Sequence, residues 1–305
     1  MPFNAPVIRL EGLTKQYGRV AALRGVSLDV RVGEIFGFLG LNGAGKTTTI
    51  RILLDLVRPT SGHAFVFGRS CQRDGLRVRQ DVAYLTGELG FYPDMTGYAT
   101  LDLLARLGAH PVSDVVRRTL LDRLELSASD LKRTIREYST GMKRKLGLIQ
   151  AFQSQAPLLI LDEPTEGLDP MMREVVYSLV DEARRDGRTV FMSSHVLPEV
   201  ERVCDRIGLL REGELVLLSP VADLRRLAAR NVRVVFRTPV PLPHPQLPEH
   251  CEAIEMTPRV WNLHVRGPMG PLVSSLTTMP VEDIDVREPH LEDALKRYYK
   301  EGKAP

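Results

Sequence analysis

The sequence predicts an α/β protein built on a parallel sheet, with its ligand-binding residues at the ends of buried strands. Three short apolar runs, at residues 35–39, 158–161 and 189–192, are typical of such strands. The first run leads into a glycine-rich segment and then into a stretch with helical periodicity at residues 47–56. Because parallel α/β sheets bind ligands at the carboxyl ends of their strands, the residues after each run form the candidate site.

The segment after the first run has the composition of a phosphate-binding loop. Glycines let successive backbone N–H groups turn toward anionic oxygens, a lysine adds a positive charge, and a hydroxyl can bind Mg²⁺. The residues are Gly40, Leu41, Asn42, Gly43, Ala44, Gly45, Lys46, Thr47 and Thr48. A glycine-rich turn that matches by accident is the alternative. The succession of strand, loop and helix favours a nucleoside triphosphate site, because the helix N-terminus also faces the phosphate.

Two adjacent carboxylates, Asp162 and Glu163, follow the second apolar run. Asp162 could hold Mg²⁺ through its water shell, and Glu163 could polarise an attacking water. Solvated acids at the end of a buried strand would explain the same residues. Downstream of a phosphate loop, we favour the metal and water roles.

A second helix N-terminus is expected where Ser139, Thr140 and Gly141 precede a long apolar-periodic stretch. Free N–H groups and the serine hydroxyl would make a second anion-binding site there. An ordinary serine cap before an amphipathic helix is the alternative, since one chain has no obvious second phosphate for this place. The basic run 143–145, which contains Arg144, is most simply a solvated helix face, although some of its charges could meet acidic groups of a partner.

Together these segments resemble the ATP-binding cassette (ABC) ATPases over roughly residues 5–220. Three weaker matches have the right order and spacing. Tyr17 stands where the family stacks an aromatic ring on adenine. Asp169 lies in what resembles the family's loop after the catalytic acid, and His195, after the third apolar run, is similar to its switch histidine. The resemblance implies a P-loop NTPase core with an antiparallel β subdomain and a helical insertion, which binds ATP and Mg²⁺.

The resemblance also implies the roles of individual residues in ATP hydrolysis. Lys46, Glu163 and His195 would be catalytic. Thr47 and Asp162 would hold the metal. Ser139 and Gly141 would complete the nucleotide site of a partner subunit across a head-to-tail dimer, and Asp169 would couple the two halves. The partner would be a second copy or another ATPase subunit.

The chain departs from the family after Thr86, where a glutamine is expected and the residues are Gly87 and Glu88. We expect Glu88 to replace that glutamine as a metal-linked or water-linked contact, because its carboxylate can accept where an amide oxygen would.

Length and composition suggest two domains in the 305 residues. We expect a nucleotide-binding domain at 5–220, with the helical insertion at about 94–155, and a small α+β module at 221–305. Nine of the 21 prolines lie between residues 239 and 280, which excludes long helices there. In the module we expect strands at 232–236 and around Trp261, which we place in its core, and a terminal helix at 290–300. This tail resembles, more loosely, the module of bacterial drug-export ATPases.

Two stretches of the insertion are singled out. Leu101, Leu104 and Leu107 are expected on an apolar helix ridge. Residues 89–95, which include Phe91 and Tyr92, are either a loop on the core or a pocket for a helix of a membrane partner.

Bulk properties limit the partners. A net charge of +3 is close to neutral and gives no reason to expect nucleic acid as a partner. The three separated cysteines argue against a disulfide framework and favour a reducing cytoplasm. The first residues, 1–11, lack the features of a secretory signal. No run approaches the roughly 18 to 20 apolar residues that span a bilayer, so separate transmembrane permease subunits would form the translocation path.

We therefore expect the ATP-hydrolysing motor of a bacterial membrane transporter, located at the cytoplasmic face of the membrane. The tail favours export, whereas the core motifs do not separate export from import. The alternative is a soluble ABC-type ATPase that acts on ribosomes or nucleic acid. Such relatives usually carry two cassettes, a long coiled coil or zinc-binding cysteines, and this sequence has none of them.

Overall fold

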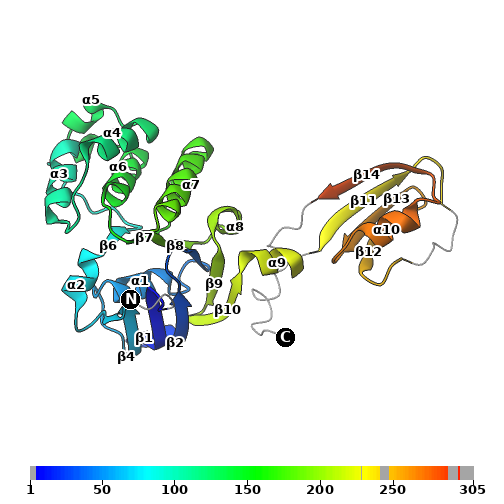
Figure 1. The fold of residues 1–305 in the computed structure, drawn as a ribbon, viewed down its shortest axis with the longest axis horizontal. Coiled ribbons are helices and arrows are strands. Elements are labelled where there is room, and N and C mark those ends of the chain that lie inside the picture. Colours follow the sequence, from blue (N-terminus) through cyan, green and yellow to red (C-terminus); the bar gives the residue numbers. More distant parts are fainter. Residues whose placement is uncertain (1–4, 228, 241–246, 288–294, 296–305) are drawn as a thin grey trace. The chain divides into compact units, whose positions relative to one another are not determined.

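A computed structural model describes residues 5–227, 229–240, 247–287 and 295. The chain divides into two compact units, Met1–Leu218 and Ser219–Pro305 (Figure 1). The division lies close to the boundary predicted after residue 220. Each unit has a hydrophobic core of its own.

The first unit is centred on a six-stranded sheet with the order β10-β9-β3-β8-β7-β6. Its strands are β3 (Ile35–Leu39), β6 (Val82–Leu85), β7 (Leu158–Asp162), β8 (Thr189–Ser194), β9 (Arg206–Arg211) and β10 (Glu214–Pro220). Strand β3 pairs in parallel with β8 and β9, and β7 pairs in parallel with β6 and β8. Every residue of β3, β7 and β8 is buried. Burial on both faces explains their continuous apolar runs.

Four helices of the first unit connect strands of its two sheets. They are α1 (Lys46–Leu53), α2 (Gly75–Gln80), α7 (Pro170–Arg185) and α8 (Leu197–Val203). Helix α1 begins directly after the predicted phosphate loop. It ends before the predicted limit of residue 56, because Asp55 has a left-handed backbone with φ of 54°.

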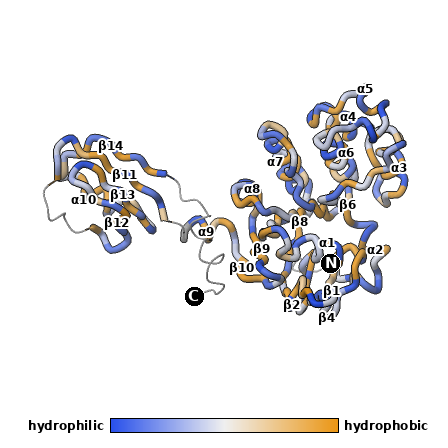
Figure 2. Tube along the Cα trace, turned by 180° about the vertical axis from the view of Figure 1, so that it is seen from behind, coloured by the Kyte–Doolittle hydropathy of each residue, from blue (hydrophilic) through white to orange (hydrophobic). Residues whose placement is uncertain are grey.

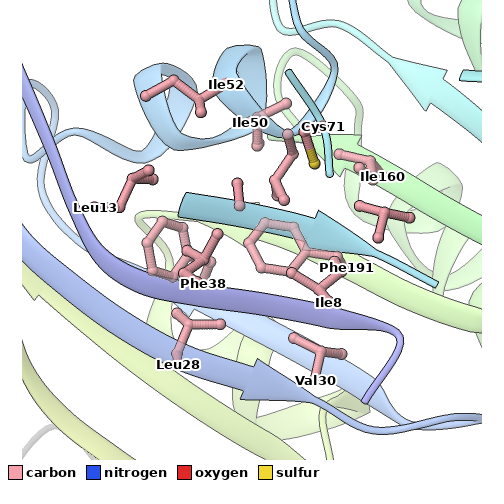
Figure 3. Packing of buried hydrophobic residues seen from close by; sticks show 14 of the residues in the cluster. Ile8, Leu13, Leu28, Val30, Phe38, Ile50, Ile52, Cys71, Ile160 and Phe191 are labelled. Carbon is pink, nitrogen blue, oxygen red and sulfur yellow. The ribbon is translucent and has the colours of Figure 1, made fainter. Parts of the chain in front are cut away.

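A second, antiparallel sheet packs beside this core and has the strand order β2-β1-β4-β5. Its strands are β1 (Ile8–Tyr17), β2 (Val20–Val30), β4 (Ser61–Val66) and β5 (Arg69–Ser70). Along β2, buried Val26, Leu28 and Val30 alternate with more exposed residues, as predicted for a half-exposed strand. Figure 3 shows Leu28 and Val30 in one cluster with residues of β1, α1 and the parallel sheet.

The helical insertion separates β6 from β7. It consists of α3 (Gly97–Leu107), α4 (Asp114–Arg123), α5 (Ala128–Lys132), the 3₁₀ helix η1 (Ile135–Glu137) and α6 (Thr140–Gln153). Helix α6 contacts α3, α4 and β6. Leu101 is fully buried, but Leu107 is 73% exposed. Leu107, predicted on the same apolar ridge, is the last residue of α3, so this end of the ridge faces solvent.

The second unit contains a four-stranded antiparallel sheet with the order β12-β13-β11-β14. Its elements are α9 (Val221–Leu227), β11 (Arg230–Phe236), β12 (Cys251–Met256), β13 (Val260–Val265), α10 (Gly270–Leu276) and β14 (Val281–Arg287). Figure 2 shows hydrophobic and hydrophilic residues alternating along these strands. Trp261 is fully buried, as predicted, with its ring centroid 4.8 Å from that of Phe236.

The tail and possible membrane-spanning segments remain to be considered. The predicted helix at 290–300 lies outside the described residues, apart from Leu295. Over the part of the chain that is described, each helix is too short or too polar to cross a membrane.

Candidate nucleotide-binding and hydrolysis site

The loop between β3 and α1 requires glycine at two positions for different reasons. Gly45 has a φ of 109°, and a Cβ atom there would lie 2.5 Å from the carbonyl oxygen of Ala22. A Cβ atom on Gly40 would lie 2.5 Å from the carbonyl oxygen of Leu210. Side chains at either position would displace the loop from the strands beneath it. The predicted phosphate loop therefore has a physical need for its glycines.

Lys46, the first residue of α1, folds back over this loop. Its Nζ donates to the carbonyl oxygens of Gly40 at 2.6 Å and Leu41 at 3.3 Å. The same nitrogen lies 3.2 Å from Oε1 of Glu163, and Lys46 is only 5% exposed. A positive charge is thus held between the loop and the end of β7.

Thr47 and Asp162, the predicted metal ligands, lie side by side. The Thr47 hydroxyl donates to Oδ2 of Asp162 at 3.1 Å, and the Ser193 hydroxyl donates to Oδ1 at 2.5 Å. No group of three or more His, Cys, Asp or Glu residues that could hold a metal occurs among the described residues. A hydroxyl and one carboxylate fit Mg²⁺ that takes its remaining ligands from substrate phosphates and water.

Glu163 and His195 form the second half of the site. Nδ1 of His195 is 2.8 Å from Oε2 of Glu163, so Lys46 and His195 contact opposite oxygens of one carboxylate. Glu163 has a φ of 51°. This left-handed conformation costs about 1–2 kcal/mol for a residue with a side chain. Its backbone N–H donates to Ser193 Oγ at 3.1 Å, which helps to hold it.

Comparison with known proteins identifies the family. The family model described as ABC transporter matches residues 23–166, which include the loop, Ser139 and both carboxylates. The chain is 36% identical over 225 residues to the bacitracin transport ATP-binding protein of Bacillus licheniformis, and the match covers 72% of each chain. This chain belongs to the ABC transporter family.

Other matches agree with this assignment. An uncharacterised ABC transporter ATP-binding protein of Nostoc sp. is 41% identical over 213 residues, which are 68% of this chain and 62% of the relative. The solved structure of an ATP-binding subunit of an ABC transporter matches with a TM-score of 0.66 and 29% identity, over 72% of this chain and 92% of that one. The predicted fold class and the prediction of an ATP-hydrolysing ABC transporter subunit are confirmed. ATP is the nucleotide of this family.

Ser139, Gly141 and Asp169, the residues predicted to serve a partner's nucleotide site, lie at helix starts. Ser139 is exposed and caps α6, its Oγ accepting from the N–H of Met142 at 3.2 Å. Asp169 is also exposed and caps α7, its Oδ1 accepting from the N–H of Met172 at 3.0 Å. Gly141 lies in the first turn of α6. The cap and the anion-site interpretations of Ser139 are compatible, since an exposed cap leaves other N–H groups available.

Tyr17 and Glu88, two further predicted site residues, are both exposed. Tyr17 ends β1, is 45% exposed, and has Lys15 Nζ 4.8 Å from its ring centroid. Glu88 is exposed. A Cβ atom on Gly87 would lie 3.3 Å from Oδ2 of Asp162, so Gly87 is placed closer to the predicted metal ligands than the sequence indicates. The role of Glu88 stays a prediction.

Sequence reasoning missed Arg144. The prediction of a solvated helix face is wrong for this residue, which is 4% exposed. Its guanidinium donates to backbone carbonyls at the ends of β6 and β7. Burial lowers the pKa of Arg144, while the nearby carboxylates of Glu166, Asp162 and Glu163 act in the opposite direction. A signal was present, because Arg144 shares helical spacing with the buried Leu148 and Ala151.

Proposed function

We propose that this chain is the ATP-driven motor of a bacterial exporter, working as a head-to-tail dimer with separate transmembrane subunits. One observation carries the proposal. Lys46, Glu163 and His195 are joined by direct contacts at one edge of the sheet, whereas Ser139 is exposed at the start of α6. A single chain thus brings together the residues for cleaving a phosphate bond but leaves the second predicted anion site facing solvent.

Each residue has a distinct task in the proposed hydrolysis. Lys46 would bind the β- and γ-phosphate oxygens, leaving its present contact with Glu163. Glu163 would orient the attacking water and accept its proton, which is general-base assistance worth about 10² to 10⁴ in rate. His195, 2.8 Å from Glu163, would hold that carboxylate and reach the γ-phosphate.

Mg²⁺ is proposed to enter with ATP. Thr47 and Asp162 would hold it, and it would neutralise charge on the phosphate oxygens as the bond breaks. The hydrogen bond between Thr47 and Asp162 supports this assignment, because it shows that the two proposed ligand oxygens lie next to each other.

The dimer is inferred from the geometry of α6. Ser139 and Gly141 lie at the exposed start of a 14-residue helix, whose first N–H groups favour an anion. A second copy, or another ATPase subunit, would supply the phosphate that this N-terminus binds. Asp169, exposed at the start of α7, would lie at the same interface.

A groove beside β6 supports a membrane partner. It has a volume of about 390 Å³ and is lined mainly by apolar side chains. These include Leu54, Leu56, Tyr84, Leu89, Phe91 and Leu104. Thr86 and Gly90 also line it, so an occupant would touch the segment that leads from β6 past Gly87. We propose that a short helix of a transmembrane subunit binds here, which would place this chain at the cytoplasmic face of the membrane.

The proposed direction of transport, export, rests on two resemblances. The relative from Bacillus licheniformis is a bacitracin transport protein, and the tail resembles that of drug-export ATPases. The rival, a soluble ATPase acting on ribosomes or nucleic acid, is disfavoured because the charge is near neutral and the groove is apolar.

A capture experiment tests this proposal. Glu163→Gln should hold the closed dimer with ATP, so tagged Glu163→Gln protein would be purified with ATP from detergent-solubilised cells of its source. A multi-span membrane protein in stoichiometric amount is expected. Ribosomes or nucleic acid in its place would contradict the proposal.

The groove is tested in the same preparation. The double substitution Leu89→Ala and Phe91→Ala, at two residues that line the groove, should lower recovery of the membrane protein while ATP binding is kept. Leu107→Ala is the matched control, because Leu107 is an exposed apolar residue of the same insertion that does not line the groove. Equal recovery with the double variant and the control would exclude the groove as the docking site.

A further inference from the structure

Helix α6 carries a buried positive charge whose hydrogen bonds all go to backbone. A guanidinium has five N–H groups, and a buried arginine needs partners for them. Arg144 Nε donates to the carbonyl of Pro164 at 3.4 Å. Its Nη1 donates to the carbonyls of Thr86 at 3.0 Å and Gly87 at 3.2 Å. Its Nη2 donates to the carbonyls of Asp162, at 3.0 Å, and Glu163.

These acceptors belong to two segments that meet at the nucleotide site. Asp162, Glu163 and Pro164 are the end of β7 and the turn after it, while Thr86 and Gly87 follow β6. Three of the five carbonyls are therefore the backbone carbonyls of Asp162, Glu163 and the following Pro164. The backbone N–H of Glu166 also donates to the carbonyl of Glu163, at 3.1 Å, but Arg144 is the residue that bonds both segments.

The backbone of Glu163 is the part that most needs support. With a φ of 51° it occupies a region that side-chain-bearing residues rarely adopt, and such a conformation persists only when its surroundings fix it. Its carbonyl accepts from Arg144, and its N–H donates to Ser193. Strand β8 thus holds one side of this peptide and α6 holds the other.

We propose that Arg144 is a positioning residue for ATP hydrolysis, which fixes the backbone of Asp162 and Glu163 and thereby the direction of the Glu163 carboxylate. The inference rests on the proposed role of Glu163. Arg144 and the cap Ser139 belong to the same helix, α6. The helix proposed to bind the partner's nucleotide is bonded directly to the hydrolytic residues of its own site.

Lysine is not an adequate substitute at this position. An ammonium is a compact charge with three donors, whereas the planar guanidinium reaches carbonyls of two separate segments at once. Arg144→Lys should therefore keep the charge and lose the positioning.

The experiment compares turnover with nucleotide affinity in the full chain. We expect Arg144→Lys to lower kcat by about 10- to 100-fold, because a small misplacement of a reacting group has effects of this size. The dissociation constant for ATP should change by less than about threefold, since binding and turnover separate when only the transition state is affected. Lys145→Met is the matched control, because its neighbouring side chain pairs with Glu125 at 3.5 Å, and it should stay within about threefold of wild type in kcat.

A double-mutant cycle separates positioning from a merely structural role. If Arg144 acts through the carboxylate, Arg144→Lys should alter the residual rate of Glu163→Gln by less than about threefold, because coupled residues are not additive. Losses that multiply would overturn the inference, as would a kcat of Arg144→Lys within about threefold of wild type.

Folding and the proposed function are controlled separately. Each variant is assayed below its unfolding temperature with a stabilising osmolyte, and recovery of wild-type kcat there would assign Arg144 to stability alone and overturn the inference. Arg144→Met is measured beside Arg144→Lys, and it should lose at least as much turnover. Full activity in Glu163→Gln would remove the proposed function and this inference with it. Loss in Glu163→Gln with full activity in Arg144→Lys would overturn this inference alone.

Discussion

The two predicted phosphate-binding segments of the first unit differ in how complete they are. Around Lys46, a single chain supplies cation, hydroxyl and carboxylates within hydrogen-bonding distance of one another. Around Ser139, the chain supplies only an exposed helix start whose serine satisfies its own helix. In the proposed mechanism, the first segment needs ATP and Mg²⁺ to become a working site, whereas the second also needs another protein chain.

Helix α6 joins these two segments. Its exposed start presents Ser139, and one turn further on Arg144 is buried against the turn that carries Glu163. In the proposed dimer, α6 would connect the serine that a subunit presents to its partner with the residues that hydrolyse the subunit's own ATP. The difference between the segments leads to four predictions, taken from the largest expected effect to the smallest.

Glu163→Gln should have the largest effect on turnover. The substitution keeps the shape of the side chain but removes its basicity, so kcat should fall by about 10³, within the range for general-base assistance. ATP binding should be retained. Glu174→Gln is the control, because Glu174 is exposed and pairs with Arg202 away from the site. Turnover of Glu163→Gln close to that of the control would show that the first segment does not contain the base.

Ser139→Ala should lower kcat by about 10², the effect of removing one hydrogen-bond donor to a transition-state oxygen. ATP binding by dilute, monomeric protein should not change, because Ser139 would serve the partner's nucleotide. Weaker binding by the monomer, measured by equilibrium dialysis, would place Ser139 at its own chain's site and contradict the distinction between the segments.

Thr47→Val should act mainly on the magnesium requirement. Losing one of two protein oxygens at the proposed metal site should raise the Mg²⁺ concentration for half-maximal turnover by about tenfold. Thr119→Val is the matched control, because Thr119 is an exposed residue of α4 whose hydroxyl bonds to its own helix. An identical Mg²⁺ titration for wild type and Thr47→Val would separate Thr47 from the metal.

Thiol reagents should have the smallest effect. Burial, followed by the charge of Asp55, raises the pKa of the Cys71 thiol to about 12. A raised pKa keeps the thiol protonated, so at pH 8 only about 10⁻⁴ of it is the reactive thiolate, and alkylation should speed up as the pH rises. ATPase activity should survive iodoacetamide at pH 8, with the modified residues identified by mass spectrometry. Rapid labelling of Cys71 at that pH would mean that the core beneath α1 opens readily.

Structural features that depend on residues close together in the sequence, such as buried strands and the phosphate loop, were predicted correctly. Strands β3, β7 and β8 appear as apolar runs because they are buried on both faces. The phosphate loop was predictable because its backbone conformation and close packing require glycine at particular positions. In the second unit, strands β11 and β13 were predicted, at residues 232–236 and around the buried Trp261, whereas β12 and β14 were not.

Contacts between distant segments were not predictable in the same way. Arg144 bonds to carbonyls 18 and 57 residues away, at Asp162 and Gly87, and a charged residue on a helix is otherwise expected in solvent. The sequence also could not show that Gly87 lies against Asp162. Backbone carbonyls are present at every position, so no residue pattern marks those that accept from an arginine.

The central claim is that each working site combines Glu163 of one chain with Ser139 of another, and complementation tests it most directly. Ser139→Ala and Glu163→Gln proteins are each purified, mixed in equal amounts with ATP and Mg²⁺, and assayed for phosphate release. A mixed dimer would contain one site with both residues intact, so the mixture should hydrolyse ATP well above the mean of the separate variants. A rate equal to that mean would contradict the account, because it would show that the two residues act within a single chain or in no common site.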